Sequence, residues 1–254
     1  MYLINMRPGQ LKKAVADRLP VIIVAGSVEY HGPQNPIGVD YLIPNSVIEA
    51  VEKRCPDDCV VAPHIVFAPT MNWAASIEEG DVDFSPQAMH DYAYEMITHI
   101  VGMGFRKIFV LQHHQGHDGL QGSCFKKIAA QISRDVSRTW GHSWGRENPA
   151  VNNNPNIGDY VFGLVQIVAI DTFSEYNEKY PRYIPIGHGG KGETQLTMAG
   201  YPETVDMAEL DNYEGPLPSW LKDAHEATLE QGKFWQEFCV DGWVKMLKER
   251  RLKA

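Results

Sequence analysis

Residues 20–33 have the sequence PVIIVA-GSVEYHGP, in which a strand pattern leads directly into a loop pattern. Its first six residues form a short apolar run rich in β-branched side chains, which predicts a strand buried on both faces. Gly26 ends the run, and the Gly- and Pro-rich segment as far as Gly38 predicts a loop at the C-terminal end of that strand. Ligands bind at this edge in open α/β sheets, so the loop is a candidate site.

One acidic and one basic side chain lie near the start of this loop. Glu29 and His31 are two residues apart, and they share one face if the chain stays extended. Asp40 follows in the turn before a helix expected over residues 44–54. Carboxylates and imidazoles are ligands of Zn, Mn and Fe. A single Glu-x-His pair at a strand end is more often a hydrogen-bonded loop pair, so the metal hypothesis depends on later segments.

The composition restricts the kinds of molecule that the protein is expected to bind. Of the 254 residues, 44% are hydrophobic and 22% charged, which is typical of globular proteins and sufficient for one domain over residues 1–254. The net charge of -9 argues against nucleic acid or an anionic membrane surface and favours a neutral or cationic small molecule, or a metal-anchored one. There is no apolar run of about 20 residues and no signal-peptide pattern. Four cysteines are too few for a disulfide scaffold, so we expect free thiols and a cytoplasmic location.

Strand and helix patterns alternate along the chain. Apolar β-branched runs predict strands at residues 20–25, 59–67, 106–111 and 161–172. Helical spacing predicts helices over residues 8–18, 44–54, 85–102 and 120–138, and over 219–251 with interruptions near Gly232 and Gly242. This alternation predicts an α/β fold with a largely parallel central sheet.

Two further loops carry metal-ligand side chains. Residues 112–119 contain His113, His114 and His117, and residues 187–194 contain His188 and Glu193. If each loop follows a strand of a parallel sheet, all three loops lie at one edge. Three carboxylates and two imidazoles exceed what one four-coordinate ion needs, whereas two ions that share a carboxylate fit. The candidate ligands are Glu29, His31, Asp40, His114 and Glu193.

The three loops together resemble the motifs of the creatininase (creatinine amidohydrolase) family. Residues 26–40 resemble its G-S-x-E-x-H-G-P-H-x-P-x-x-T-D stretch, and residues 188–194 resemble its H-A-G-x-x-E-T motif. Residues 112–117, QHHQGH, resemble its N-G-H-G-G-N motif more loosely. The order of the motifs matches over residues 20–200.

The resemblance implies a three-layer α/β/α fold, two divalent metal ions and a homo-oligomer, often a hexamer. Asp40 is expected to bridge the two ions. Glu29 and His114 would complete the coordination of one ion, and His31 and Glu193 that of the other. His188 falls on the catalytic histidine of the family. Zn is the first expectation for the metal, and Mn or Fe are the alternatives. Because the middle motif departs from the family pattern, His113 or His117 remain alternative or additional ligands.

The implied activity is hydrolysis of a C–N bond in a small cyclic or linear amide by a hydroxide bound to two metals. The creatinine enzyme has a carboxylate two residues after its middle histidine, and this chain has Gly116 there. Membership of the family is therefore better supported than creatinine as the substrate. The alternatives are a dinuclear phosphoesterase, for which only Lys191 offers a cationic clamp within the motifs, and a non-catalytic metal-binding subunit.

Overall fold

A parallel sheet of four strands forms the centre of the computed structural model, which describes residues 1–116, 118–139, 161–180 and 183–253. Strand β1 (Val21–Ala25) lies between β2 (Val60–Val61) and β3 (Ile108–Gln112), and β4 (Val165–Val168) pairs with β3. The order is β2-β1-β3-β4. The runs predicted at residues 20–25 and 106–111 are therefore strands, whereas those at 59–67 and 161–172 contain shorter strands than expected.

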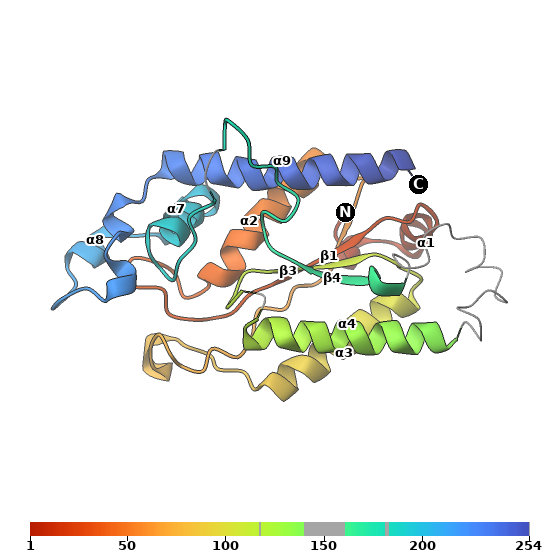
Figure 1. The fold of residues 1–254 in the computed structure, drawn as a ribbon, viewed down its shortest axis with the longest axis horizontal. Helices are drawn as coiled ribbons and strands as arrows, with labels where there is room; N and C mark the ends of the chain where they lie inside the picture. The colour runs from red at the N-terminus through yellow and green to blue at the C-terminus, as the bar shows by residue number, and fades with distance from the viewer. Residues whose placement is uncertain (117, 140–160, 181–182, 254) are drawn as a thin grey trace.

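Helices cover both faces of the sheet (Figure 1). One layer consists of α2 (Val39–Arg54), α7 (Lys191–Gly200) and α9 (Leu229–Lys253), and the other includes α3 (Pro86–Gly102) and α4 (Leu120–Arg138). The three-layer α/β/α prediction is confirmed. None of the described helices is long and apolar enough to span a membrane. The other elements among the described residues are α1 (Pro8–Ala16), α8 (Met207–Asp211), η1 (Leu3–Asn5), η2 (Ile77–Glu79), η4 (Pro202–Thr204), η5 (Ser219–Leu221) and η6 (Ala224–Glu226).

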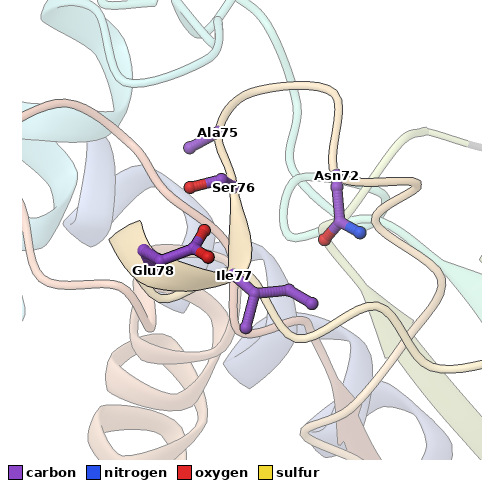
Figure 2. A pocket seen from close by; sticks show the side chains of 5 residues that line it. All are labelled: Asn72, Ala75, Ser76, Ile77 and Glu78. Carbon is purple, nitrogen blue, oxygen red and sulfur yellow. The ribbon is translucent and has the colours of Figure 1, made fainter.

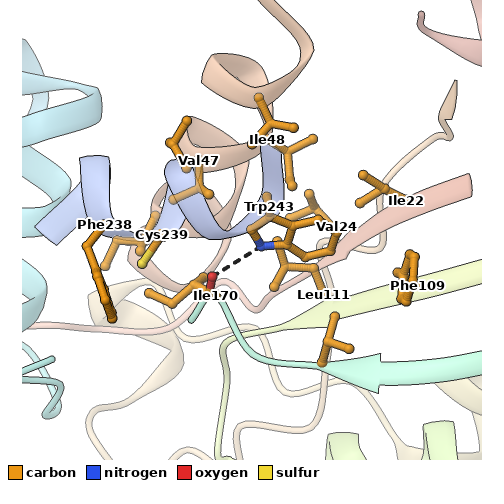
Figure 3. Close-up of a cluster of buried hydrophobic side chains, with 14 of the residues drawn as sticks. Ile22, Val24, Val47, Ile48, Phe109, Leu111, Ile170, Phe238, Cys239 and Trp243 are labelled. Carbon is orange, nitrogen blue, oxygen red and sulfur yellow. Dashed lines mark hydrogen bonds between the residues drawn. The ribbon is translucent and has the colours of Figure 1, made fainter. Parts of the chain in front are cut away.

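Alternation along β1 divides the core in two. Ile22 and Val24 belong to the cluster under α2 and α9, whereas Val21 and Ile23 belong to the cluster with α3 and α4. Both clusters are fully buried at β1, as a strand covered on both faces requires. In the first cluster, the indole of Trp243 on α9 donates Nε1–H to the carbonyl of Ile170 at 3.1 Å (Figure 3). Burial of this large side chain therefore leaves its polar group paired.

Helix α9 runs without a break from Leu229 to Lys253, so the predicted interruptions at Gly232 and Gly242 are wrong. Both glycines instead mark close approaches of this helix. A Cβ at Gly232 would collide with the backbone carbonyl of Gln195 on α7, and one at Gly242 would lie 2.6 Å from the hydroxyl of Ser174. The glycines are needed for packing between elements, which a pattern read along one segment cannot show.

Replacing Gly232 with alanine is expected to destabilise the fold. Alanine favours a helix by about 1 kcal/mol over glycine, but overpacking against a backbone carbonyl costs roughly 1–3 kcal/mol or more. Thermal unfolding should show Tm falling by several degrees. Gly9 lies in the exposed face of α1 with open space around its Cα, so Gly9→Ala is the matched control and should keep or raise Tm. An unchanged Tm in Gly232→Ala would contradict the packing argument.

Candidate metal centre

The five predicted ligands come together at the C-terminal edge of the sheet. Glu29 and His31 lie in the loop after β1, and His114 lies two residues after β3. Asp40 lies in the first turn of α2, which begins at Val39 and not at residue 44 as predicted. Glu193 lies in the first turn of α7, so the predicted loop over residues 187–194 is wrong after Gly190. All five residues are buried, with exposed fractions from 1% for His31 to 6% for Glu29.

Gly26 lets α2 approach the end of β1. A Cβ at this position would lie 2.6 Å from the Asp40 carbonyl oxygen and from backbone atoms of Tyr41. Because the helix start can pack against the strand end, the Asp40 carboxylate reaches Ser27, whose hydroxyl donates to Oδ2 at 2.6 Å. Ser27 belongs to the first motif, but its contact with Asp40 could not be predicted from the motif alone.

The ligand atoms form two buried groups that share Asp40. One group is Glu29, Asp40 and His114, and the other is His31, Asp40 and Glu193. Within each group the candidate donor atoms lie within 4.8 Å of one another. A third group combines Glu29 and His31 with His188, which is only partly buried. The arrangement matches the division of ligands that the resemblance implies, with one carboxylate between two donor sets.

Each of two histidines turns one ring nitrogen toward these carboxylates. His31 Nδ1 donates to the carbonyl of Glu29 at 2.9 Å, so Nε2 faces Asp40 Oδ1 at 3.4 Å and Glu193 Oε2 at 3.6 Å. His114 Nε2 donates to the carbonyl of Pro69 at 2.9 Å, so Nδ1 faces Asp40 Oδ2 at 2.8 Å and Glu29 Oε2 at 3.3 Å. A backbone carbonyl that fixes the other ring nitrogen is typical of metal-ligating histidines.

The charges of this cluster are strongly coupled. Burial lowers the pKa of His31, but the carboxylates of Asp40 and Glu193 outweigh burial and raise the pKa to about 10. Burial also opposes protonation of His114, and hydrogen bonds to Asp40 and Glu29 raise its pKa to about 10. Burial favours the neutral acid at Asp40, yet the two histidines hold its pKa well below its usual range. In the metal-free chain, protons on the imidazoles therefore balance the carboxylates.

The residues fit divalent metal ions. His31 Nε2 is buried and has no hydrogen-bond partner, although it faces two carboxylate oxygens. Three carboxylates and two imidazoles form a donor set suited to Zn, Mn or Fe. Both Asp40 and Glu193 lie at helix N-termini, where the helix dipole favours negative charge. Glu29, Asp40 and His114 would hold one ion, and His31, Asp40 and Glu193 a second.

His188 lies at the edge of the cluster. Its side chain is 33% exposed, and its ring lies over that of His31 with 4.2 Å between ring centroids. Nε2 donates to the carbonyl of Tyr30 at 2.8 Å, which leaves Nδ1 facing Glu29 Oε2 at 4.0 Å. Trp220 packs edge-on against the His188 ring, with 4.9 Å between the ring centroids. His188 is the most exposed of the residues in these groups.

Trp220 is a residue that sequence reasoning missed. It lies in η5, where the sequence predicted the start of the C-terminal helix, which instead begins at Leu229. A Cβ at Gly189 would lie 3.0 Å from the Trp220 ring, so the glycine after His188 allows the indole to pack there. No local motif marks this tryptophan, because the contact joins segments more than 30 residues apart.

The loop after β3 brings two histidines to the cluster. Gln112 Nε2 donates to the carbonyls of His114 and Gly116 at 2.6 and 2.7 Å, which closes the turn. His114 lies in the group with Glu29 and Asp40, whereas His113 Nε2 lies 3.3 Å from Glu193 Oε1. His117, the other alternative ligand, lies outside the described residues.

A separate hollow of about 430 Å³ opens in the loop after β2. Asn72, Ala75, Ser76, Ile77 and Glu78 line it (Figure 2). It contains none of the candidate ligands, and Ile77 is 72% exposed. We therefore assign the chemistry to the buried cluster and not to this hollow.

Comparison with known families shows to which family the chain belongs. The family model described as creatininase, creatinine amidohydrolase, matches residues 5–247. The chain belongs to the creatininase family. Members of this family are metal-dependent amidohydrolases that act on amide C–N bonds, so the chain is an enzyme of that class. No curated protein sequence matches the chain.

Solved creatininase structures share the fold at low identity. A creatininase variant complexed with creatine is 18% identical, covers 98% of each chain and has a TM-score of 0.72. A structure described as creatininase Mn gives the same identity, coverage and TM-score. A creatininase variant of the Zn-Zn type is 18% identical, with 98% of this chain and 97% of that chain covered and a TM-score of 0.70. At this identity, the structures show a common fold.

Proposed function

We propose that this creatininase-family enzyme holds two divalent ions and hydrolyses a C–N bond of a small cyclic or linear amide. The observation that carries the proposal is the pair of buried donor groups, Glu29–Asp40–His114 and His31–Asp40–Glu193, which have Asp40 in common. When bound, the two ions would supply Lewis acidity toward the amide carbonyl and toward water. The burial of the candidate ligands, which are at most 6% exposed, favours a small substrate.

Residues of the protein would orient the metal ligands and transfer protons. Ser27 and the α2 N-terminus hold the Asp40 carboxylate between the two groups. His188 presents Nδ1 toward the cluster because its Nε2–H is used by the Tyr30 carbonyl. An acceptor nitrogen at this place can take a proton from the attacking water and return it to the leaving nitrogen.

The phosphoesterase alternative has less support. Phosphoryl transfer needs cationic groups around the phosphate, and Lys191 was the cationic candidate in the motifs. Its Nζ pairs with Glu226 Oε2 at 3.0 Å, and it lies at the start of α7. A lysine already neutralised by a carboxylate is a poor phosphate clamp.

The test combines metal analysis with a substrate panel. Protein reconstituted with Zn or Mn is expected to contain close to two ions per chain and to hydrolyse cyclic or linear amides, with activity lost in chelator and restored by metal. A metal ratio near zero would contradict the proposal. Turnover of phosphomonoesters without amides would favour the phosphoesterase, and two ions without any turnover would favour a metal-binding subunit.

The assembly, location and metal preference stay predictions. We propose a homo-oligomer, with a hexamer expected from the family resemblance, in the cytoplasm, with Zn as the first candidate metal and Mn or Fe as alternatives. The free state of Cys55, Cys59, Cys124 and Cys239 agrees with a reducing compartment. Sedimentation velocity tests the assembly, and elemental analysis of protein purified without chelator tests the metal.

A further inference from the structure

His113 is the point at which this chain departs most clearly from the middle motif of its family, where a glycine precedes the ligand histidine. Its side chain is 3% exposed, and its backbone N–H donates to the carbonyl of Ala25 at 3.3 Å, which continues the pairing of β3 with β1 by one residue. Its Nε2 has no hydrogen-bond partner. A buried polar group without a hydrogen-bond partner lowers the stability of the fold by about 1–3 kcal/mol. An imidazole in place of glycine therefore needs a partner for this nitrogen.

The nearest acid group to this nitrogen is Glu193. His113 Nε2 lies 3.3 Å from Oε1 of that carboxylate. The other oxygen, Oε2, accepts the backbone N–H of Gly189 at 2.6 Å and faces His31 Nε2 at 3.6 Å. The two carboxylate oxygens thus have different neighbours, and Oε2 is the one turned toward the donor group with His31 and Asp40.

His113 is not itself placed among the donors. Each of the donor groups found among the described residues has its candidate atoms within 4.8 Å of one another, and none of them includes His113. Its ring contacts Oε1 of Glu193, whereas His31 faces Oε2 of the same carboxylate. The position is therefore that of a group acting through a ligand and not that of a ligand.

We propose that His113 is a positioning residue for Glu193. The contact of 3.3 Å between Nε2 and Oε1 lacks hydrogen-bond geometry as it stands, and a small side-chain rotation would direct Nε2–H at Oε1. This hydrogen bond would keep the carboxylate rotated so that Oε2 faces the second donor group. This inference rests on the proposed dinuclear site and deepens it, because it assigns a residue that the family motif lacks to the affinity of one ion. Partners that orient a metal ligand are worth about 10–100-fold in metal affinity.

The test uses two variants of similar size that differ in hydrogen bonding. His113→Leu removes the donor, and His113→Gln retains an N–H near the position of Nε2. The metal-free chains are titrated with Zn²⁺ against a chromophoric chelator. His113→Leu is expected to lower the affinity for one of the two ions by about 10–100-fold and to leave the affinity for the other unchanged. His113→Gln should bind both ions almost as tightly as the wild type. His64, which pairs with Tyr41 outside the cluster, provides the control His64→Gln.

The outcomes separate this inference from the proposed function. A wild-type chain that binds no Zn²⁺ would overturn both. A wild-type chain with two ions and unchanged affinities in His113→Leu would overturn the role of His113 alone. Loss of one ion in both the Leu and Gln variants would show that His113 is a ligand and overturn the positioning role. Circular dichroism of the metal-free variants checks folding, and His113→Ala replaces His113→Leu if the latter is unfolded.

Discussion

Asp40→Ala is expected to lose both metal ions and with them all measurable turnover, whereas His31→Ala is expected to lose mainly one ion. Asp40 belongs to both fully buried donor groups, with Oδ2 2.8 Å from His114 Nδ1 and Oδ1 3.4 Å from His31 Nε2. A bridging carboxylate enters two coordination shells, but an imidazole enters one. Elemental analysis after reconstitution with Zn measures the difference.

Folding must be separated from metal loss in this experiment. Removing Asp40 also removes the acceptor of Ser27 and leaves two imidazoles with less neutralising charge. Asp40→Asn keeps the shape and much of the hydrogen bonding, so it should fold and still bind metal poorly. Asp81 is another buried carboxylate, bonded to the backbone N–H of Tyr30 and outside the donor groups, so Asp81→Asn should retain two ions. Equal metal loss in Asp40→Ala and His31→Ala would argue against bridging.

His188→Asn is expected to keep both ions and substrate binding while kcat falls by roughly 10²–10⁴-fold, the range typical of a positioned acid or base. In this proposed role the reacting atom is Nδ1, because the Tyr30 carbonyl can only accept a hydrogen bond and therefore places the hydrogen on Nε2. Nδ1 lies 4.0 Å from Glu29 Oε2, at the partly exposed side of the cluster. A steady-state assay on the amide identified by the panel measures kcat and KM separately.

Metal content distinguishes this role from ligation. His188 shares a possible donor group with Glu29 and His31, so a ligand role predicts that His188→Asn loses an ion. The catalytic role predicts two ions and a lower kcat. His99 lies on α3 with a side chain 78% exposed, and His99→Asn serves as the control with unchanged kinetics. Wild-type turnover in His188→Asn would refute the catalytic assignment.

Local sequence patterns predicted most of the strands and helices of the fold. The continuous apolar run at residues 20–25 and the helix predicted over residues 85–102 depend on neighbouring residues only, and both are present in the fold. Helix α4 has the predicted bounds for the same reason. The start of α2 was placed too late, because the glycine and proline content before Pro44 obscured a helix that begins at Val39 and includes that proline.

The sequence alone was sufficient to predict the family, the α/β class and a set of candidate metal ligands, because motif order and hydrophobic periodicity are properties of the chain. Only the tertiary structure decided which oxygen and nitrogen atoms face one another. Asp40 reaches the cluster because α2 packs at Gly26, and Glu193 reaches it because α7 begins at Lys191. The contacts of His113 with Glu193 and of Trp220 with His188 join distant segments. Such contacts depend on the packing of whole elements, and no local spacing encodes them.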